Sequence, residues 1–327
     1  MLGCAESEIL LTAGGTESVN TAVRGLLAAR SPRKRVVTTT VEHSASRELC
    51  QQLAKEGNEI VEIGVDQKGS LDFDEVRRAV TDETALVSIM WANNETGVLF
   101  PVSDIAGICR EKRMPFHCDG TQAVGKIPVN VAELRIDAMS FAAHKFHGPK
   151  GVGGLFVRRG LRFRPLVIGG PQERGRRGGT ENVPGVVGMG KAAELAKQSL
   201  PLMSSRVAPL RDRLESQILA NIPDTSVNGR TDARLPNTTN ISFARLEAEA
   251  ILLLLSEQGI CASAGAACAS GSLEPSHVLR AMKIQDKIAH GAIRFSLSRY
   301  TTDAEIDRAL QVLPGVISRL RAVLPVG

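Results

Sequence analysis

The sequence predicts an α/β protein with a mostly parallel seven-stranded sheet, helices on both faces of that sheet, and a smaller α+β domain after it. Short apolar runs alternate with amphipathic segments through the first half of the chain, as in βαβ units. The run 85–92 is almost continuously apolar, which is typical of a strand buried on both faces. The alternation of apolar and amphipathic segments stops in the glycine-rich stretch Gly169–Gly190. We therefore expect a large domain over residues 1–195 and a small domain over residues 196–327.

Periodicity and capping signals define the individual elements. The expected strands of the large domain are 8–12, 36–41, 59–65, 85–92, 114–118, 137–142 and 153–158. Its expected helices are 16–29, 44–56, 72–80 and 103–113, the third with Asp72 as an acidic N-cap. Residues 169–190 are expected to form a long loop. Beyond it we expect helix 192–219 broken at Pro201, strand 239–243, helices 246–258 and 276–282, strand 292–298 and helix 303–320.

Composition excludes several classes of protein. The chain has 327 residues, of which 43% are hydrophobic and 23% charged, as in an ordinary globular protein. A net charge of +5 with one Trp and one Tyr does not favour nucleic-acid binding, which usually needs a basic stripe and stacking aromatics. The cysteines show no C-x-x-C spacing, and the N-terminus shows no signal peptide. The longest apolar run, 250–255, is too short to span a membrane. We expect free thiols in the cytoplasm.

Polar residues follow four of the expected strands. His43 follows the strand 36–41, Asn93 and Asn94 follow 85–92, Asp119 follows 114–118, and His144 with Lys145 follows 137–142. Ligands of open α/β sheets bind beyond the carboxyl ends of the strands. One or two such residues would be unremarkable, but four indicate a site.

Each of these residues also has a structural interpretation. Asp119 could pair with a pyridinium nitrogen or cap the next helix. Lys145 could form a Schiff base, because partial desolvation lowers the pKa of a lysine, or it could extend to the surface from a strand end. A lone His43 is more often an N-terminal helix residue. The turn Thr12–Glu17 could receive an anion at a helix start or be a plain βα turn.

Two residues of the small domain are also candidates. Cys268 lies among small residues in the stretch 261–271, which favours a loop. A thiol there could carry a group from substrate to partner, or be inert. Arg294, in the strand 292–298, could bind a substrate carboxylate bidentately or form a structural ion pair.

Together these motifs resemble one family over almost the whole chain, the NifS/IscS-like cysteine desulfurases. These are pyridoxal-phosphate (PLP) enzymes of fold type I in the class V aminotransferase group. The matching segments are 14–18, 42–43, 91–97, 117–126, 140–154, 172–182, 266–277 and 293–296, in family order. The sequences of segments 91–97 and 174–182 are most similar to those of the nitrogen-fixation branch.

The resemblance implies a role for each candidate. Lys145 would bind PLP covalently, His43 would stack on its ring, Asp119 would pair with the ring nitrogen, and Gln122 would hydrogen-bond the phenolic oxygen. The phosphate would be bound by Gly15, Thr16 and His144, with Thr180 reaching it from the second subunit of a homodimer. Asn94 and Arg294 would bind the substrate carboxylate. The catalytic residues would be Lys145, Cys268 and His43.

The implied reaction converts L-cysteine to L-alanine. Cys268 would receive the sulfur as a persulfide and pass it to an iron–sulfur scaffold protein, and through that persulfide it could also bind iron transiently. The alternatives are a selenocysteine lyase, which shares the cofactor chemistry, and a non-catalytic PLP-binding fragment. A plain aminotransferase needs no loop cysteine.

Two departures from the family pattern are visible. Ala142 stands where members often have a hydroxyl residue, so one phosphate contact is expected to be absent. The family begins with an N-terminal arm that borders the active site, and this sequence starts after it. Either the true start lies upstream of Met1, or this is a truncated form, in which the missing arm would weaken the dimer and impair turnover.

Overall fold

The computed structural model describes residues 1–265 and 275–323, and the chain divides into two compact units. The first unit comprises Met1–Val65, Leu71–Asn93 and Leu99–Leu200. The second comprises Asp66–Ser70, Asn94–Val98 and the chain from Pro201 onward. Each unit has a hydrophobic core of its own. Two short segments, 66–70 and 94–98, thus belong to the second unit although the chain around them belongs to the first.

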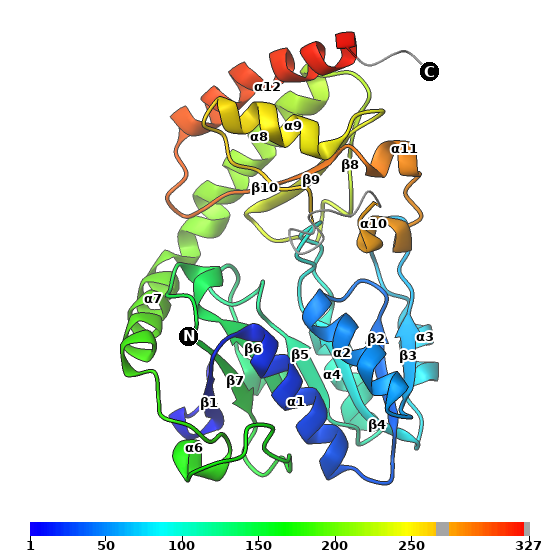
Figure 1. Ribbon diagram of the computed structural model, residues 1–327, viewed down its shortest axis with the longest axis vertical. Helices are drawn as coiled ribbons and strands as arrows, with labels where there is room; N and C mark the ends of the chain where they lie inside the picture. Colours follow the sequence, from blue (N-terminus) through cyan, green and yellow to red (C-terminus); the bar gives the residue numbers. More distant parts are fainter. Residues whose placement is uncertain (266–274, 324–327) are drawn as a thin grey trace. The chain divides into compact units, whose positions relative to one another are not determined.

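A seven-stranded sheet forms the centre of the first unit, as predicted (Figure 1). Its strands are β1 (Ile9–Thr12), β2 (Arg35–Thr39), β3 (Glu59–Ile63), β4 (Thr84–Met90), β5 (Phe116–Asp119), β6 (Ala138–Ala142) and β7 (Gly153–Val157). They lie in the order β1-β7-β6-β5-β4-β2-β3. The pairs from β6 across to β3 are all parallel, and β7 is antiparallel to both of its neighbours. The sheet is therefore mostly parallel, and β4 is buried at every position, as its apolar sequence predicts.

Helices pack against the strands of this sheet. The helices are α1 (Gly15–Ala29), α2 (Ser44–Lys55), α3 (Phe73–Ala79), α4 (Val102–Glu111), α5 (Val131–Leu134), α6 (Gln172–Gly175) and α7 (Val183–Leu202), with 3₁₀ turns at Glu6–Glu8 and Ala143–Phe146. The apolar face of α1, with Val19, Val23 and Leu26, packs with α2 and the strands in one core cluster. Asp72 caps α3 as predicted, because its Oδ1 accepts from the Asp74 N–H at 2.8 Å.

The region predicted as a long loop is partly helical, which corrects the expectation for residues 169–190. Helix α7 begins at Val183, inside the glycine-rich stretch. Asn182 makes this start favourable because its Oδ1 accepts from the Gly185 N–H at 3.1 Å, and Pro184 suits a first helical turn. Pro201 does not break the helix either. A π-helical turn, Met203–Val207, follows it, and the Pro201 carbonyl accepts from Ser204 and Ser205 hydroxyls.

The second unit is a small antiparallel sheet with helices. Its strands are β8 (Thr225–Val227), β9 (Thr238–Phe243) and β10 (Ala292–Ser296), in the order β10-β9-β8. Its helices are α8 (Ala208–Asn221), α9 (Ala248–Glu257), α10 (His277–Ala281), α11 (Asp286–Ala289) and α12 (Asp303–Val323). Side chains of α8, α9 and α12 pack with β9 and β10 in one core. Within the described residues, no helix is both long and apolar enough to cross a bilayer.

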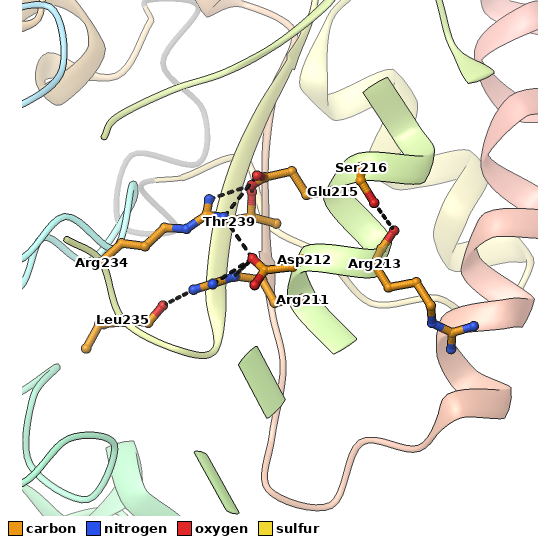
Figure 2. A network of polar contacts seen from close by, with 8 residues as sticks. All are labelled: Arg211, Asp212, Arg213, Glu215, Ser216, Arg234, Leu235 and Thr239. Atoms are coloured by element: carbon orange, nitrogen blue, oxygen red, sulfur yellow. Dashed lines mark hydrogen bonds and ion pairs between the residues drawn. The ribbon is translucent and has the colours of Figure 1, made fainter. Parts of the chain in front are cut away.

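A buried network of charged residues connects α8 to the segment before β9 (Figure 2). Both amino groups of the Arg234 guanidinium bind the Glu215 carboxylate, and the Thr239 hydroxyl donates to the same carboxylate. Arg211 binds Asp212 and the Leu235 carbonyl. The Leu235 N–H in turn donates to the Gly97 carbonyl at 2.8 Å. The network therefore holds the segment Asn94–Val98 within the second unit.

We expect Arg234→Ala to lower the free energy of unfolding of the protein by about 3–5 kcal/mol, because it leaves the Glu215 carboxylate buried without its cation. The side chains of Arg234 and Glu215 are only 4% and 11% exposed. Arg213, whose partners Asp303 and Asp307 are exposed, provides the control. Arg213→Ala should cost less than about 1 kcal/mol. Urea unfolding followed by circular dichroism measures both, and equal losses would contradict the assignment.

Candidate active site

The predicted site residues of the large sheet lie at one edge. Because β2, β4, β5 and β6 are parallel, their carboxyl ends meet at the same edge. His43 is the N-cap of α2, after β2. Asp119 is the last residue of β5, and Lys145 lies in the 3₁₀ turn that follows β6. Asn93, after β4, is buried and donates its side-chain amide to the Val41 carbonyl at 3.1 Å.

The His43 ring is fixed in one tautomer. Its Nδ1 accepts from the Ala45 N–H at 3.1 Å, so the hydrogen of the neutral ring is on Nε2. Burial lowers the pKa of His43; the negative charge of Asp119 raises it and the positive charge of Lys145 lowers it. Both charges thus act on the ring. His43 is therefore a neutral aromatic ring at neutral pH, in the electrostatic field of the other two candidates.

Asp119 ends β5, close in sequence to a set of polar groups that spans three adjacent strands. Its side chain is 7% exposed, and its Oδ1 accepts from the Thr121 N–H at 3.0 Å. Two residues before it, the buried His117 ring lies between two hydroxyls. Its Nδ1 is 2.8 Å from the Ser88 Oγ on β4, and its Nε2 is 2.8 Å from the Ser140 Oγ on β6. Burial lowers the pKa of His117 to about 4, against the opposing effect of Asp119.

The start of α1 is shaped to receive an anion. Gly14, the N-cap, has φ 154° and ψ −176° and offers no side-chain cap to the first N–H groups of the helix. A Cβ at Gly15 would lie 3.2 Å from the Thr121 hydroxyl and 3.6 Å from the Ala142 Cβ, so only glycine keeps this corner open. Burial lowers the pKa of His144, as do the charges of Lys145 and Lys150.

Gln122 and Thr180 have different surroundings. The Gln122 Oε1 accepts from the Lys126 ammonium, which leaves the NH₂ of the amide to donate elsewhere. Thr180 is exposed and lines a cavity of about 100 Å³ beside Thr12, Ala13 and Gly151.

These residues fit PLP. The uncapped helix start beside Gly15 suits a phosphate. A carboxylate at Asp119 suits a pyridine nitrogen, and a neutral ring at His43 suits the face of an aromatic ring. The amine of Lys145 supplies the nucleophile for an aldehyde. The residues at this edge therefore fit the cofactor.

In the second unit, Arg294 and Asn94 lie together. The Arg294 Nη1 donates to the Asn94 carbonyl at 2.7 Å and to the Gly265 carbonyl at 3.0 Å. Among the described residues, the buried Arg294 Nε and Asn94 Oδ1 have no hydrogen-bond partner. Burial lowers the pKa of Arg294, and the charge of Glu95 raises it. An arginine in this state has capacity for a carboxylate.

The cysteine predicted to receive sulfur, Cys268, lies outside the described residues. Both described flanks are anchored: Gly265 by Arg294, and Ser276 by its hydroxyl bond to the Glu95 carboxylate. Cys261 is exposed. Within residues 1–265 and 275–323, no cluster of His, Cys, Asp and Glu could hold a metal ion.

Known proteins identify the family. Residues 1–309 match the family described as aminotransferase class-V. The cysteine desulfurase of Nostoc sp. is 54% identical over 99% of this chain and 81% of its own length. Cysteine desulfurase NifS of Azotobacter vinelandii is 52% identical over 98% of this chain and 80% of its own length. The chain belongs to the cysteine desulfurases of the class-V aminotransferase family.

Solved structures agree with this membership. A NifS-like protein superposes with a TM-score of 0.91 and 39% identity, covering 98% of this chain and 85% of its own. SspA in complex with cysteine has a TM-score of 0.79 and 32% identity, covering 92% of this chain and 84% of its own. The predicted fold class and family are confirmed.

Sequence reasoning gave no role to several polar residues of this desulfurase. Glu42, His117 and Glu95 are all buried. Each lies within two residues of a predicted site residue, namely His43, Asp119 and Asn94, and that proximity in sequence was the available signal. A charged residue directly after a β-branched strand is expensive to bury unless it has partners.

We expect His117 to remain uncharged well below the ordinary pKa of histidine, 6.5. Because its pKa in the folded protein is lowered to about 4, the unfolded chain binds the proton first as the pH falls. The contribution of His117 to folding stability should therefore decrease as the pH falls from about 6.5 through about 4, by on the order of 3 kcal/mol. Histidine NMR titration, with His117→Asn to assign the signal, measures the pKa. A midpoint near 6.5 for that signal would contradict this prediction.

Proposed function

We propose that this chain takes sulfur from L-cysteine with PLP bound by Lys145 and leaves it on Cys268. The convergence of His43, Asp119 and Lys145 at one sheet edge carries the proposal, because both charges act on the neutral ring. The domain of residues 1–195 holds the cofactor, and the domain of residues 196–327 carries the loop with Cys268. Membership in the cysteine desulfurases supports the choice of substrate.

The first unit supplies the cofactor contacts. Asp119 pairs with the ring nitrogen, His43 stacks on the ring, and Gln122 donates its free NH₂ to the phenolic oxygen. The helix start at Gly15 and Thr16, together with His144, holds the phosphate. When bound, PLP withdraws electrons from the α-carbon of the amino acid and makes its proton acidic.

Substrate contacts come from the second unit. The Arg294 guanidinium, already oriented by two backbone carbonyls, binds the α-carboxylate of cysteine through the donors that remain. Asn94 adds its side-chain amide. The bound cysteine of SspA shows that a structural relative accepts this amino acid. A guanidinium whose Nε has no hydrogen-bond partner among the described residues favours a ligand that carries a carboxylate.

The chain's own residues then move one proton and one sulfur. The Lys145 amine takes the α-proton of the substrate and returns a proton during the formation of alanine. The Cys268 thiolate attacks the substrate sulfur, so an S–S bond forms while the Cβ–S bond breaks. L-Cysteine and the Cys268 thiol thus give L-alanine and a Cys268 persulfide, with no net oxidation.

The downstream chemistry follows from the persulfide. Its outer sulfur passes to an iron–sulfur scaffold protein in the cytoplasm, in the setting of nitrogen fixation that the NifS relative suggests. A homodimer completes the site, because Thr180 is exposed and would reach the phosphate of a second copy. Exposed apolar residues of α7, Val183 and Val187, support such an interface.

The direct test is PLP loading followed by addition of L-cysteine, with alanine and sulfide measured. Cys268→Ala should retain the visible absorbance of bound PLP and lose sulfide release, by at least about a hundredfold, because the nucleophile is gone. Cys261→Ala is the matched control, since Cys261 is an exposed cysteine of the same domain. Lys145→Ala should lose the covalently bound chromophore. Sulfide release by Cys268→Ala at the parent rate would refute the persulfide.

The dimer is tested at Val187, whose side chain is 67% exposed one helical turn from Val183. Val187→Glu should shift the protein from dimer to monomer in sedimentation velocity, because it places a charge in an apolar interface. Leu253→Glu on α9 is the control, with a side chain that is 64% exposed in the second unit. A dimer that survives Val187→Glu would exclude this face.

A further inference from the structure

β2, the strand that leads to His43, separates from one of its two neighbours, β4, before it reaches the site. β2 and β4 pair at Arg35–Thr84, Val36–Leu86 and Val37–Val87, with a register shift between the first two pairs, and the ladder extends no further. Beyond it, β2 leads to His43, while β4 continues beside β5 to Met90, which pairs with Asp119. The backbone groups that face each other past Val37 therefore need other partners, because buried N–H groups are rarely left unsatisfied.

The Glu42 side chain provides this partner. Its Oε1 accepts from the Met90 N–H at 3.0 Å and from the Thr39 hydroxyl at 2.8 Å. The side chain is almost fully buried, with 1% exposure. One oxygen thus connects the residue before His43 to the residue paired with Asp119. A second connection, from the Asn93 amide to the Val41 carbonyl at 3.1 Å, runs in parallel.

The surroundings favour an uncharged carboxylic acid at this position. Burial raises the pKa of Glu42 to about 8, the two hydrogen bonds oppose this, and the negative charge of Asp119 raises it further. The thiols near it, Cys50 on α2 and Cys118 on β5, have raised pKa values themselves and remain neutral. The adjacent His43 has a lowered pKa and offers no positive charge at neutral pH. Because Oε1 accepts both hydrogen bonds, the proton belongs on Oε2.

We propose that Glu42 is a positioning residue whose neutral carboxyl group fixes the segment carrying His43 to the end of β4, beside Asp119. Its effect on the cofactor rests on the function proposed above, in which His43 stacks on PLP. The neutral form leaves Asp119 without a second negative charge beside it. When Glu42 loses its proton, repulsion from Asp119 and the cost of a buried charge loosen this connection.

Three proteins separate this role from simple space filling. Glu42→Gln keeps the acceptor oxygen and places an NH₂ where the hydroxyl was, so it imitates the neutral acid. Glu42→Leu keeps most of the volume and removes the acceptor. Glu62→Gln, at an exposed position of β3, is the control for loss of a carboxylate.

The first readout needs no cofactor. Infrared difference spectra at neutral pH should show the C=O stretch of a protonated carboxylic acid in the wild type and in Glu62→Gln, and its loss in Glu42→Gln. Relative to Glu42→Gln, the wild type should lose folding stability as the pH rises from about 4.5 to about 8, because its folded state holds this proton and its unfolded state does not. The contribution of His117, which has the opposite sign below about pH 6.5, is common to both proteins and cancels in this difference. Absence of this band from the wild-type spectrum would overturn the neutral carboxyl group, whether or not PLP binds.

The second readout is the PLP dissociation constant and the visible spectrum against pH. At neutral pH, Glu42→Gln should bind PLP within about twofold of the wild type, and Glu42→Leu about 10–100-fold more weakly, as expected for one lost buried acceptor. Above pH 8 the wild type should lose affinity and Glu42→Gln should not. Weakening in Glu42→Gln equal to that in Glu42→Leu, or wild-type binding in Glu42→Leu, would overturn the role. If Glu42→Leu does not fold, the wild type and Glu42→Gln still decide.

Discussion

The carboxyl ends of four parallel strands converge at one edge of the sheet, and polar groups there must be satisfied where little water reaches. Asp119 is 7% exposed at the end of the central strand β5, between β4 and β6. Burial of a carboxylate is costly unless hydrogen bonds and a cation compensate it. The other polar groups of the edge can be understood from this cost, because each of them binds backbone groups or hydroxyls without adding a charge of the same sign.

Several titratable groups near Asp119 are uncharged. The pKa of His117 is lowered to about 4, that of Glu42 is raised to about 8, and that of the Cys118 thiol is raised well above its ordinary value, in each case chiefly by burial. Near neutral pH these three groups are uncharged. Asp119 is therefore the negatively charged group among these four, and its charge acts on the His43 ring together with that of Lys145. Such a field suits a cationic ring nitrogen, which PLP supplies under the proposed function.

Much of this arrangement follows from the sequence, and the remainder depends on which strands become neighbours. Alternating apolar runs predicted the seven strands, and strand ends predicted the positions of His43, Asp119 and Lys145. The pairing of His117 with two serines could not be predicted, because Ser88 and Ser140 flank it only when β4 and β6 flank β5.

Local capping explains the other differences. The helical start at Val183 depends on Asn182 as a cap, a weaker signal than the surrounding glycines. The short strand β8 has only three residues, too few for a periodic pattern, and was not predicted. The interpretation of Cys268 rests on the resemblance and on its small neighbours.

The second unit contains a positively charged group whose hydrogen bonds are incomplete among the described residues. The Nη1 of Arg294 donates to the carbonyls of Asn94 and Gly265. These bonds orient the guanidinium, but the carbonyls do not neutralise its charge. Its Nε remains buried without a hydrogen-bond partner among the described residues. A buried cation in this state is a cost to the folded protein, and an anion that can reach it recovers that cost on binding. Proteins keep such defects mainly where a ligand repairs them. Under the proposed function, an α-amino acid supplies such an anion as its carboxylate, next to the carbon at which the chemistry occurs.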